Sequence, residues 1–221
     1  IYLSYGDIET AQKRVAESLA LGPEEPFPLS AQALLLATTG KTDEAVAISR
    51  AALAMELEDR WGSHYVFLRL VRDDALESGN YNEALAWFRK YEPQLFASPP
   101  QLDAENLNKA PNLALLLRAA GATQEADALL KETIAAWDDL YTLGSANFPL
   151  GIAIVDALAL LGQEDAAVSK LRELYEDGWR VSWRFDTLQN PNHEALRDNE
   201  DYLAILSDVE ADLQKQVDAA L

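Results

Sequence analysis

Apolar residues recur along this chain at the spacing of three to four residues that places them on one face of a helix. Four such stretches, LSAQALLLATTG, HYVFLRLVRDDALESG, NLALLLRAAG and GIAIVDALALLG, each end on a glycine. This spacing predicts amphipathic α-helices, and glycine ends a helix readily because it adopts the left-handed conformation without a steric cost. An acidic or short polar residue follows each glycine, which is the signal for a second helix. We therefore expect an all-α fold.

An internal repeat is marked by glycines that are followed five residues later by an alanine. The intervals between successive glycines are 34, 39, 42 and 41 residues. The pairs are Gly6/Ala11, Gly40/Ala45, Gly79/Ala84, Gly121/Ala126 and Gly162/Ala167. We place the glycine in the turn inside each helix pair and the alanine in the first turn of the second helix, where a small side chain lets antiparallel helices approach closely. The residues expected to cap the second helices are Asp7, Thr42, Asn80 and Thr123.

The segments GDIETAQKRVAESLALGP and GNYNEALAWFRKYEP resemble the second half of a tetratricopeptide repeat (TPR). The first glycine interval, 34 residues, equals the TPR period. The resemblance implies a TPR-like α-solenoid, which is a right-handed superhelix of antiparallel helix pairs. We expect a single domain over residues 1–221 with about five pairs, of which the first keeps only residues 1–5 of its first helix. Because the chain starts without methionine, we expect it to be a fragment of a longer protein.

Two stretches and the C-terminal region depart from the repeat. Residues 94–106 and 137–150 carry loop sequences such as ASPP and LGSANFP, and we predict insertions there. Residues 178–221 are expected to form a cap: an irregular segment, GWRVSWRFDTLQNPN, and then a helix from about Glu200. The apolar stripe of that helix is Tyr202, Leu206, Val209, Leu213 and Val217.

The C-terminal sequence ELYEDGWRVSWRFDTLQNPNHEALRDNEDYLAILSDVEADLQKQ is similar to the ends of certain bacterial signalling proteins. In these, a repeat domain follows a winged-helix DNA-binding domain of the ToxR/CadC type or an adenylate cyclase domain. The shared residues are Gly178, Trp179, Leu196, Arg197, Tyr202 and Leu206. The resemblance implies a regulatory, signal-receiving domain of a transcriptional regulator or cyclase. The alternative is a stand-alone scaffold that binds a peptide or protein.

Composition narrows the classes of partner. The net charge of -19, from 37 acidic and 18 basic residues, repels phosphate, so we expect no direct binding of nucleic acid. No run approaches the roughly 18 apolar residues of a membrane span, and no signal peptide is visible. The absence of cysteine fits both a cytoplasmic and a periplasmic location, and these stay open, as does a homo-oligomer.

Sequence motifs for catalysis or metal binding are weak. TTGKT at residues 38–42 imitates the end of a P-loop, but Leu35 stands where the first glycine is required and a helix precedes it. His64 and His193 lie far apart without partner motifs, and we interpret both as surface or packing residues. No calcium-loop pattern organises the carboxylates. We expect no enzyme activity, no cofactor and no metal.

Two surfaces are candidates for partner binding. In a solenoid the first helices line a concave groove, which is the default site for an extended peptide or a protein helix. Its predicted lining is Leu34, Arg69, Asp73, Leu76, Leu115, Arg118, Ile152 and Asp156. The basic clamp of chaperone-binding TPR proteins is missing from these positions. The alternative site consists of Trp179, Arg180, Trp183 and Arg184, residue types that are enriched at binding hot spots. We favour a structural role for this segment, with tryptophans filling the junction to the cap helix.

Overall fold

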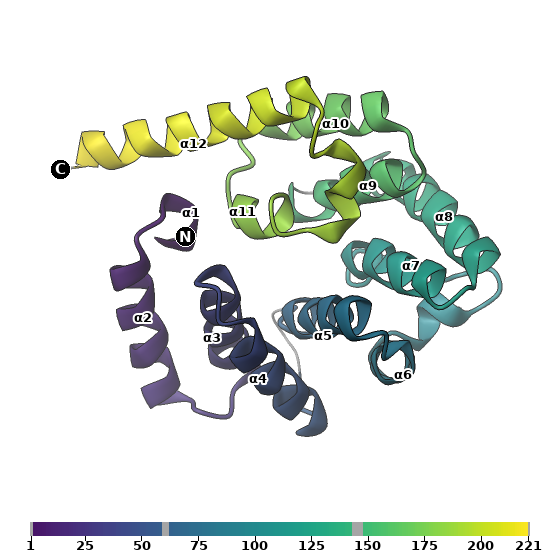
Figure 1. The fold of residues 1–221 in the computed structure, drawn as a ribbon, viewed down its shortest axis with the longest axis horizontal. Helices are drawn as coiled ribbons and strands as arrows, with labels where there is room; N and C mark the ends of the chain where they lie inside the picture. Colours follow the sequence, from purple (N-terminus) through teal and green to yellow (C-terminus); the bar gives the residue numbers. More distant parts are fainter. Residues whose placement is uncertain (1, 59–61, 143–147, 221) are drawn as a thin grey trace. The chain divides into compact units, whose positions relative to one another are not determined.

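The computed structural model describes residues 2–58, 62–142 and 148–220, and within these ranges the chain is helical without a β-strand, as predicted. The chain divides into two compact units, which we describe separately. The N-terminal unit comprises Tyr2 and Gly6–Pro93, and the C-terminal unit comprises Leu3–Tyr5 and Gln94–Leu221 (Figure 1). The prediction of a single repeat domain stays a prediction.

Consecutive helices pack as pairs in each unit. In the N-terminal unit α3 packs on α4 and α5 on α6, and in the C-terminal unit α7 packs on α8 and α9 on α10. The helices up to α6 are α1 (Tyr2–Tyr5), α2 (Ile8–Leu21), α3 (Pro26–Thr38), α4 (Thr42–Ala54), α5 (His64–Ser78) and α6 (Tyr81–Tyr91). The following elements are η1 (Pro93–Phe96), η2 (Leu107–Lys109), α7 (Ala110–Ala119), α8 (Thr123–Thr142), α9 (Phe148–Leu160), α10 (Glu164–Glu176), α11 (Trp183–Asp186), η3 (Pro191–Leu196) and α12 (Glu200–Ala220).

Gly40, Gly79, Gly121 and Gly162 lie in the turns between paired helices, as predicted, and Gly6 lies between α1 and α2. Gly121 has a φ of 88°, and its N–H donates to the carbonyl of Arg118 while the next N–H, from Ala122, donates to Leu117. This is the Schellman motif, in which a left-handed residue satisfies the last carbonyls of a helix. The same bonds recur at Gly40 and Gly162, whose φ values are 80° and 72°.

The predicted capping residues are correct at two of the four positions. Asp7 is the N-cap of α2 and its side chain accepts the N–H of Thr10, whereas Asn80 occupies the N-cap position of α6 but its side chain makes no capping hydrogen bond. The prediction was wrong for Thr42 and Thr123, which are the first residues of α4 and α8. At α4 the N-cap is Lys41, whose side chain makes no capping bond. The Schellman turn closes at Lys41, which takes the N-cap position, so the second helix begins one residue earlier than a Thr42 cap would require.

The repeat alanines are buried, with 0–5% of their surface exposed. They lie on the second helix of each pair, where their small side chains permit close packing. The positions nine residues after the glycines are also buried at Ser49, Phe88, Leu130 and Leu171, and half-buried at Val15. Both sets therefore form the inward face of the second helices.

Replacing Ala84 or Ala126 with leucine is expected to lower the free energy of unfolding by about 1–3 kcal/mol, because the added methylenes overpack a filled interface. The measurement is urea unfolding followed by circular dichroism. Ala135→Leu, at an exposed position of α8, is the matched control and should be near neutral. Equal stability of all three variants would contradict the assigned interface.

The predicted insertions have different outcomes. Residues 94–106 lack α-helix, as expected, and contain η1 and a turn in which Asp103 accepts the N–H groups of Glu105 and Asn106. The second prediction, at residues 137–150, was wrong in part. Helix α8 continues to Thr142, because Trp137 packs in a core cluster with Leu107 and Ile154. Residues 143–147 lie outside the described ranges.

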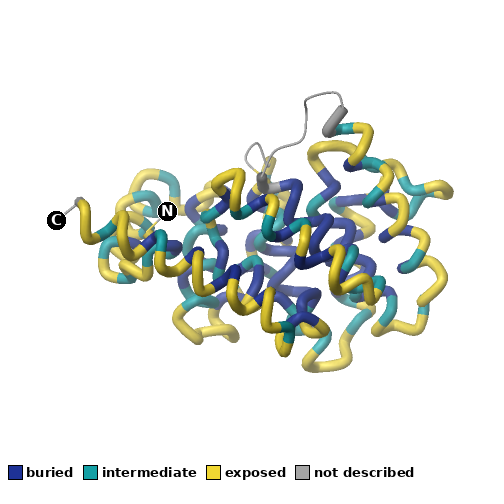
Figure 2. Tube along the Cα trace, turned by 90° about the horizontal axis from the view of Figure 1, so that it is seen from above, coloured by how far each residue is buried: buried dark blue, intermediate teal, exposed yellow. Residues whose placement is uncertain are grey.

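The predicted C-terminal helix from Glu200 is confirmed, and its role as the cap of a repeat array stays a prediction. Helix α12 begins at Glu200 and packs along α10 in the C-terminal unit (Figure 1). Buried and exposed residues alternate along the helices (Figure 2), and the predicted stripe of α12 is buried at every position except Val217, which is half-buried. The preceding segment, predicted to be irregular, contains the short helices α11 and η3. Among the described residues, no helix has the length and apolar character required to cross a membrane.

Candidate functional site

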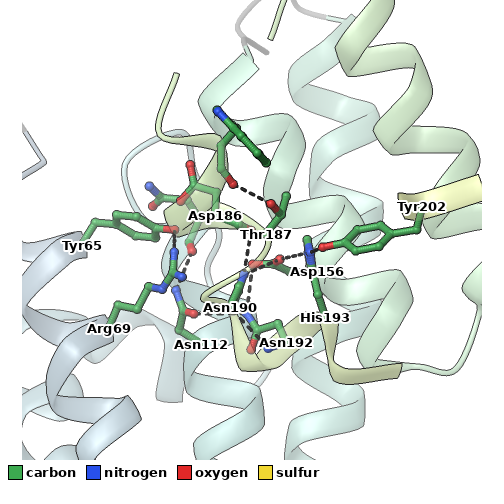
Figure 3. A network of polar contacts seen from close by, with 12 residues as sticks. Tyr65, Arg69, Asn112, Asp156, Asp186, Thr187, Asn190, Asn192, His193 and Tyr202 are labelled. Carbon is green, nitrogen blue, oxygen red and sulfur yellow. Dashed lines mark hydrogen bonds and ion pairs between the residues drawn. The ribbon is translucent and has the colours of Figure 1, made fainter. Parts of the chain in front are cut away.

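The C-terminal unit contains a buried network of polar side chains (Figure 3). Its members come from α7, α9, α12 and the segment that joins α11 to α12, and each is at most 1% exposed. They are Asn112, Asp156, Thr187, Asn190, Asn192, His193 and Tyr202. Buried polar groups of this kind require hydrogen-bond partners, since an unsatisfied group costs about 1–3 kcal/mol.

The carboxylate of Asp156 is the centre of the network. Its Oδ1 accepts the side-chain amide of Asn190 at 2.9 Å, and its Oδ2 accepts that of Asn192 at 2.9 Å. The Nε2 atom of His193 lies 2.6 Å from Oδ1. A single side chain of α9 thus contacts three residues of the segment that leads to α12.

His193 connects Asp156 to the cap helix. Its Nδ1 lies 2.9 Å from the hydroxyl of Tyr202 on α12, and the two rings meet edge to face. Burial raises the pKa of Tyr202 well above its ordinary value, so the hydroxyl stays protonated. His193 therefore lies between Asp156 of α9 and Tyr202 of α12, although its Nε2 forms no hydrogen bond of good geometry within the described part of the chain.

The sequence Asn190–Pro191–Asn192 folds locally to present these groups. The Asn190 side chain caps η3 by accepting the N–H of Asn192, and Pro191 occupies the first position of η3, where its missing N–H costs nothing. The Asn192 amide also donates to Oδ1 of Asn112 on α7 at 3.2 Å. The segment is therefore held to both α7 and α9.

Asp156, His193 and Tyr202 are residue types used in acid–base catalysis, but they are buried in this arrangement. A substrate would have to displace η3 or α12 to reach them. No group of three or more potential metal ligands occurs among the described residues. The geometry fits a structural role. The network attaches the segment between α11 and α12 to α7 and α9, which are the first helices of the last two helix pairs.

The predicted groove residues of the C-terminal unit are placed as follows. Ile152 and Asp156 of α9 are 3% and 1% exposed, because α12 and η3 pack against this helix or its neighbours. Arg118 pairs with Asp127 and donates to the carbonyl of Leu160. Leu115 is half-buried. The chain's own C-terminal segment thus occupies the face of α9 that the sequence interpretation assigned to a partner.

In the N-terminal unit the predicted groove residues differ in exposure. Arg69 is fully buried and donates to the hydroxyl of Tyr65 at 3.2 Å. Asp73 lies 2.7 Å from the guanidinium of Arg72; burial raises the pKa of Asp73, and the charges of Arg72 and Arg69 oppose that shift. Leu34 and Leu76 are half-buried. Partner binding at these positions stays a prediction.

The alternative site is largely packed into the core. Trp179 and Trp183 are 3% and 2% exposed and belong to the cluster that contains Tyr202 and Leu206 of α12. The guanidinium of Arg180 lies over the ring of Tyr175 and pairs with Asp212 at 3.0 Å, and Arg184 pairs with Glu210 at 2.6 Å. The tryptophans fill the junction to the cap helix, as the favoured interpretation had it.

The N-terminal residues of the C-terminal unit contact this same junction. The carbonyl of Ser4 accepts the indole N–H of Trp183 at 3.2 Å and a guanidinium N–H of Arg184 at 3.0 Å. The Ser4 hydroxyl accepts the N–H of Ser182 at 2.9 Å. Tyr5 donates to Gln216 of α12 at 3.1 Å. Residues from both ends of the chain therefore stabilise α11.

The attachment of α12 is expected to weaken in acid. Hydrogen bonds from Tyr175 and Arg180 lower the pKa of Asp212 below its ordinary value. A carboxyl whose pKa is lower in the folded state stabilises the fold above its unfolded-state pKa of about 3.9, and that contribution is lost as the pH falls through the folded value. The difference in urea midpoint between wild type and Asp212→Asn should be constant above about pH 5 and shrink below about pH 4. A difference that does not change down to about pH 3 would contradict this assignment.

Two motifs that were set aside in the sequence have structural roles. Gly40 of TTGKT forms the Schellman turn after α3, and Lys41 pairs with Glu44 at 3.7 Å. His64 is half-buried and lies edge to face with Tyr91, with ring centroids 4.4 Å apart. His193 was interpreted as a surface or packing residue and is a fully buried member of the polar network.

Sequence reasoning did not identify Asn112, Asn190 and Asn192 as network members. The available signal was the N-P-N-H run, since asparagine on both sides of a proline is typical of a structured turn whose side chains bond locally. The two partners of the Asn192 side-chain amide, Asp156 and Asn112, lie 36 and 80 residues away in the chain. Comparison of the sequence with models of protein families and with curated proteins finds no match.

Proposed function

We propose that this chain is a non-catalytic, TPR-like repeat module that binds a protein or peptide and receives a signal for a larger bacterial regulator. The proposal is carried by one recurring unit. In it, a helix ends at a left-handed glycine and a second helix follows with a buried alanine five residues after that glycine. Helix-pair arrays of this type present extended surfaces to partners.

Two further observations support binding of protein rather than nucleic acid. The net charge of -19 disfavours phosphate-rich ligands. The acid–base side chains of the Asp156 network are buried and engaged with one another, so they support a structural attachment of the cap. By resemblance, the attached effector would be a winged-helix or adenylate cyclase domain, and the function of this module would be to regulate it.

The test is selection of peptides on the purified chain. Displayed random peptides of about 12 residues are selected against the immobilised protein, and enriched sequences are synthesised and titrated by calorimetry. We expect a recurrent motif with a Kd of about 1–100 μM, the range of modest peptide affinities. Replicate selections that converge on no motif, with a chain that is folded by circular dichroism, would count against a peptide-binding module.

A further inference from the structure

A hollow of about 710 Å³ opens in the N-terminal unit, where α2 ends and α3 begins. It is lined by the turn between these helices and by the residues that follow α4. Its lining includes the apolar residues Leu21, Phe27 and Leu57 and the acidic residues Glu24, Glu25 and Glu58. Its volume lies within the roughly 300–1,000 Å³ that is typical of ligand sites.

Two large apolar side chains of the hollow face solvent. Leu21 is 92% exposed and Phe27 is 57% exposed, while Leu57 is half-buried. Exposed apolar groups are common singly, but Leu21 and Phe27 line the same concavity with Leu57. Burial of these side chains by a partner would be favourable.

The turn fixes this apolar display. Helix α2 ends at Leu21, and a Cβ atom at Gly22 would lie 2.7 Å from Cγ of Glu25, so the turn is tight at this point. Helix α3 then starts with Pro26 and Pro28, both buried, on either side of the exposed Phe27. The prolines restrict the backbone, so Phe27 is presented from a defined helix start and not from a loose tail.

The rim of the hollow is acidic. Glu24, Glu25 and Glu58 are exposed, and the described lining contains no lysine or arginine. Within the described part of the chain, Glu24 and Glu25 form no ion pair. Apolar side chains beside carboxylates complement a ligand that is both apolar and cationic.

We propose that this hollow binds a cationic peptide segment of the partner, in which a bulky apolar side chain is flanked by lysine or arginine. The apolar side chain would pack on Leu21 and Phe27, and the flanking cations would lie near Glu24 and Glu25. This inference rests on the proposed function and names its site and partner class. A second copy of the chain is a poor occupant, because two molecules with a net charge of -19 repel each other.

The experiment uses a fluorescein-labelled peptide of about ten residues with a central phenylalanine between lysines, titrated by anisotropy at low ionic strength. Two control peptides replace either the lysines with glutamate or the phenylalanine with serine. The chain variants are Phe27→Ser and Glu24→Lys. Their matched controls are Leu203→Ser and Glu176→Lys, which alter exposed residues of the C-terminal unit. All positions are exposed, so the variants are expected to fold, as checked by circular dichroism.

We expect each hollow variant and each control peptide to weaken binding at least about tenfold, while Leu203→Ser and Glu176→Lys change it less than about twofold. Equal effects of hollow and control variants would overturn the proposal. Displacement of the peptide by spermidine, at spermidine concentrations near the Kd of the peptide, would also overturn it, because this result indicates a polyamine site. Self-association that is lost in Phe27→Ser would assign the hollow to a second copy and also overturn it. If the selected peptides bind Phe27→Ser as tightly as they bind the wild type, the hollow is not the binding site and the proposed function stands. If no peptide binds the chain, both the site and the proposed function are wrong.

Discussion

Asp156→Ala is expected to lower the free energy of unfolding by about 3–5 kcal/mol, because at least two buried donors lose their acceptor at a cost of about 1–3 kcal/mol each. The change leaves the side-chain amides of Asn190 and Asn192 without their acceptor, and it leaves Nε2 of His193 without the carboxylate that lies 2.6 Å away. Water cannot replace these contacts readily, because the donors are at most 1% exposed. Urea unfolding measured by circular dichroism gives the free energy.

The controls separate the network from the general loss of a carboxylate. Asp208→Ala removes an exposed carboxylate of α12 and should change stability by less than about 0.5 kcal/mol. A double-mutant cycle between Asp156→Ala and His193→Ala should show coupling of about 1–3 kcal/mol, since the residues are in direct contact. Additive effects of the two changes would show that the network is not a unit.

The helices and their turns follow from local sequence, which is why they could be predicted. Gly40, Gly121 and Gly162 end their helices through bonds that span only a few residues. The stripe of α12 likewise depends on the spacing of apolar residues within one helix. The start of α4 was misplaced by one residue because Thr42 is a good capping residue, yet the turn geometry makes Lys41 the N-cap.

The candidate sites depend on contacts between segments that are distant in sequence. The spacing of apolar residues within one helix does not predict such contacts. The apolar spacing of α9 correctly places Ile152 and Asp156 on one face, but it does not say what covers that face. In the structure the cover is supplied by residues of the chain itself, through Asn190, Asn192 and His193. Arg69 illustrates the same limit: a charged residue on a predicted surface is fully buried, with a tyrosine hydroxyl as one of its partners.

Trp183→Ala is expected to lower the free energy of unfolding by about 3–5 kcal/mol, the usual cost of truncating a buried tryptophan. The side chain is 2% exposed and packs in the cluster that joins α9, α10 and α12. Its indole N–H donates to the carbonyl of Ser4, and the guanidinium of Arg184 lies 4.3 Å from the centre of its ring. The substitution therefore removes apolar packing, a buried hydrogen bond and a cation–π contact together.

Trp183→Phe and Val181→Ala divide this effect into its parts. Phenylalanine keeps most of the apolar contact but cannot donate to Ser4, so we expect a loss of about 1–2 kcal/mol, the hydrogen bond plus incomplete packing. Val181 is 60% exposed and lies two residues before Trp183, and its truncation should cost less than about 0.5 kcal/mol. Hydrogen exchange gives an independent readout, since the Trp183 indole N–H should exchange slowly in the wild type. Ser4→Ala should not change this rate, because the acceptor of the indole N–H is the backbone carbonyl of Ser4. Rapid exchange of this indole in the folded wild type would show that the aromatic segment is open to solvent, and the packing assigned to the cap junction would then be wrong.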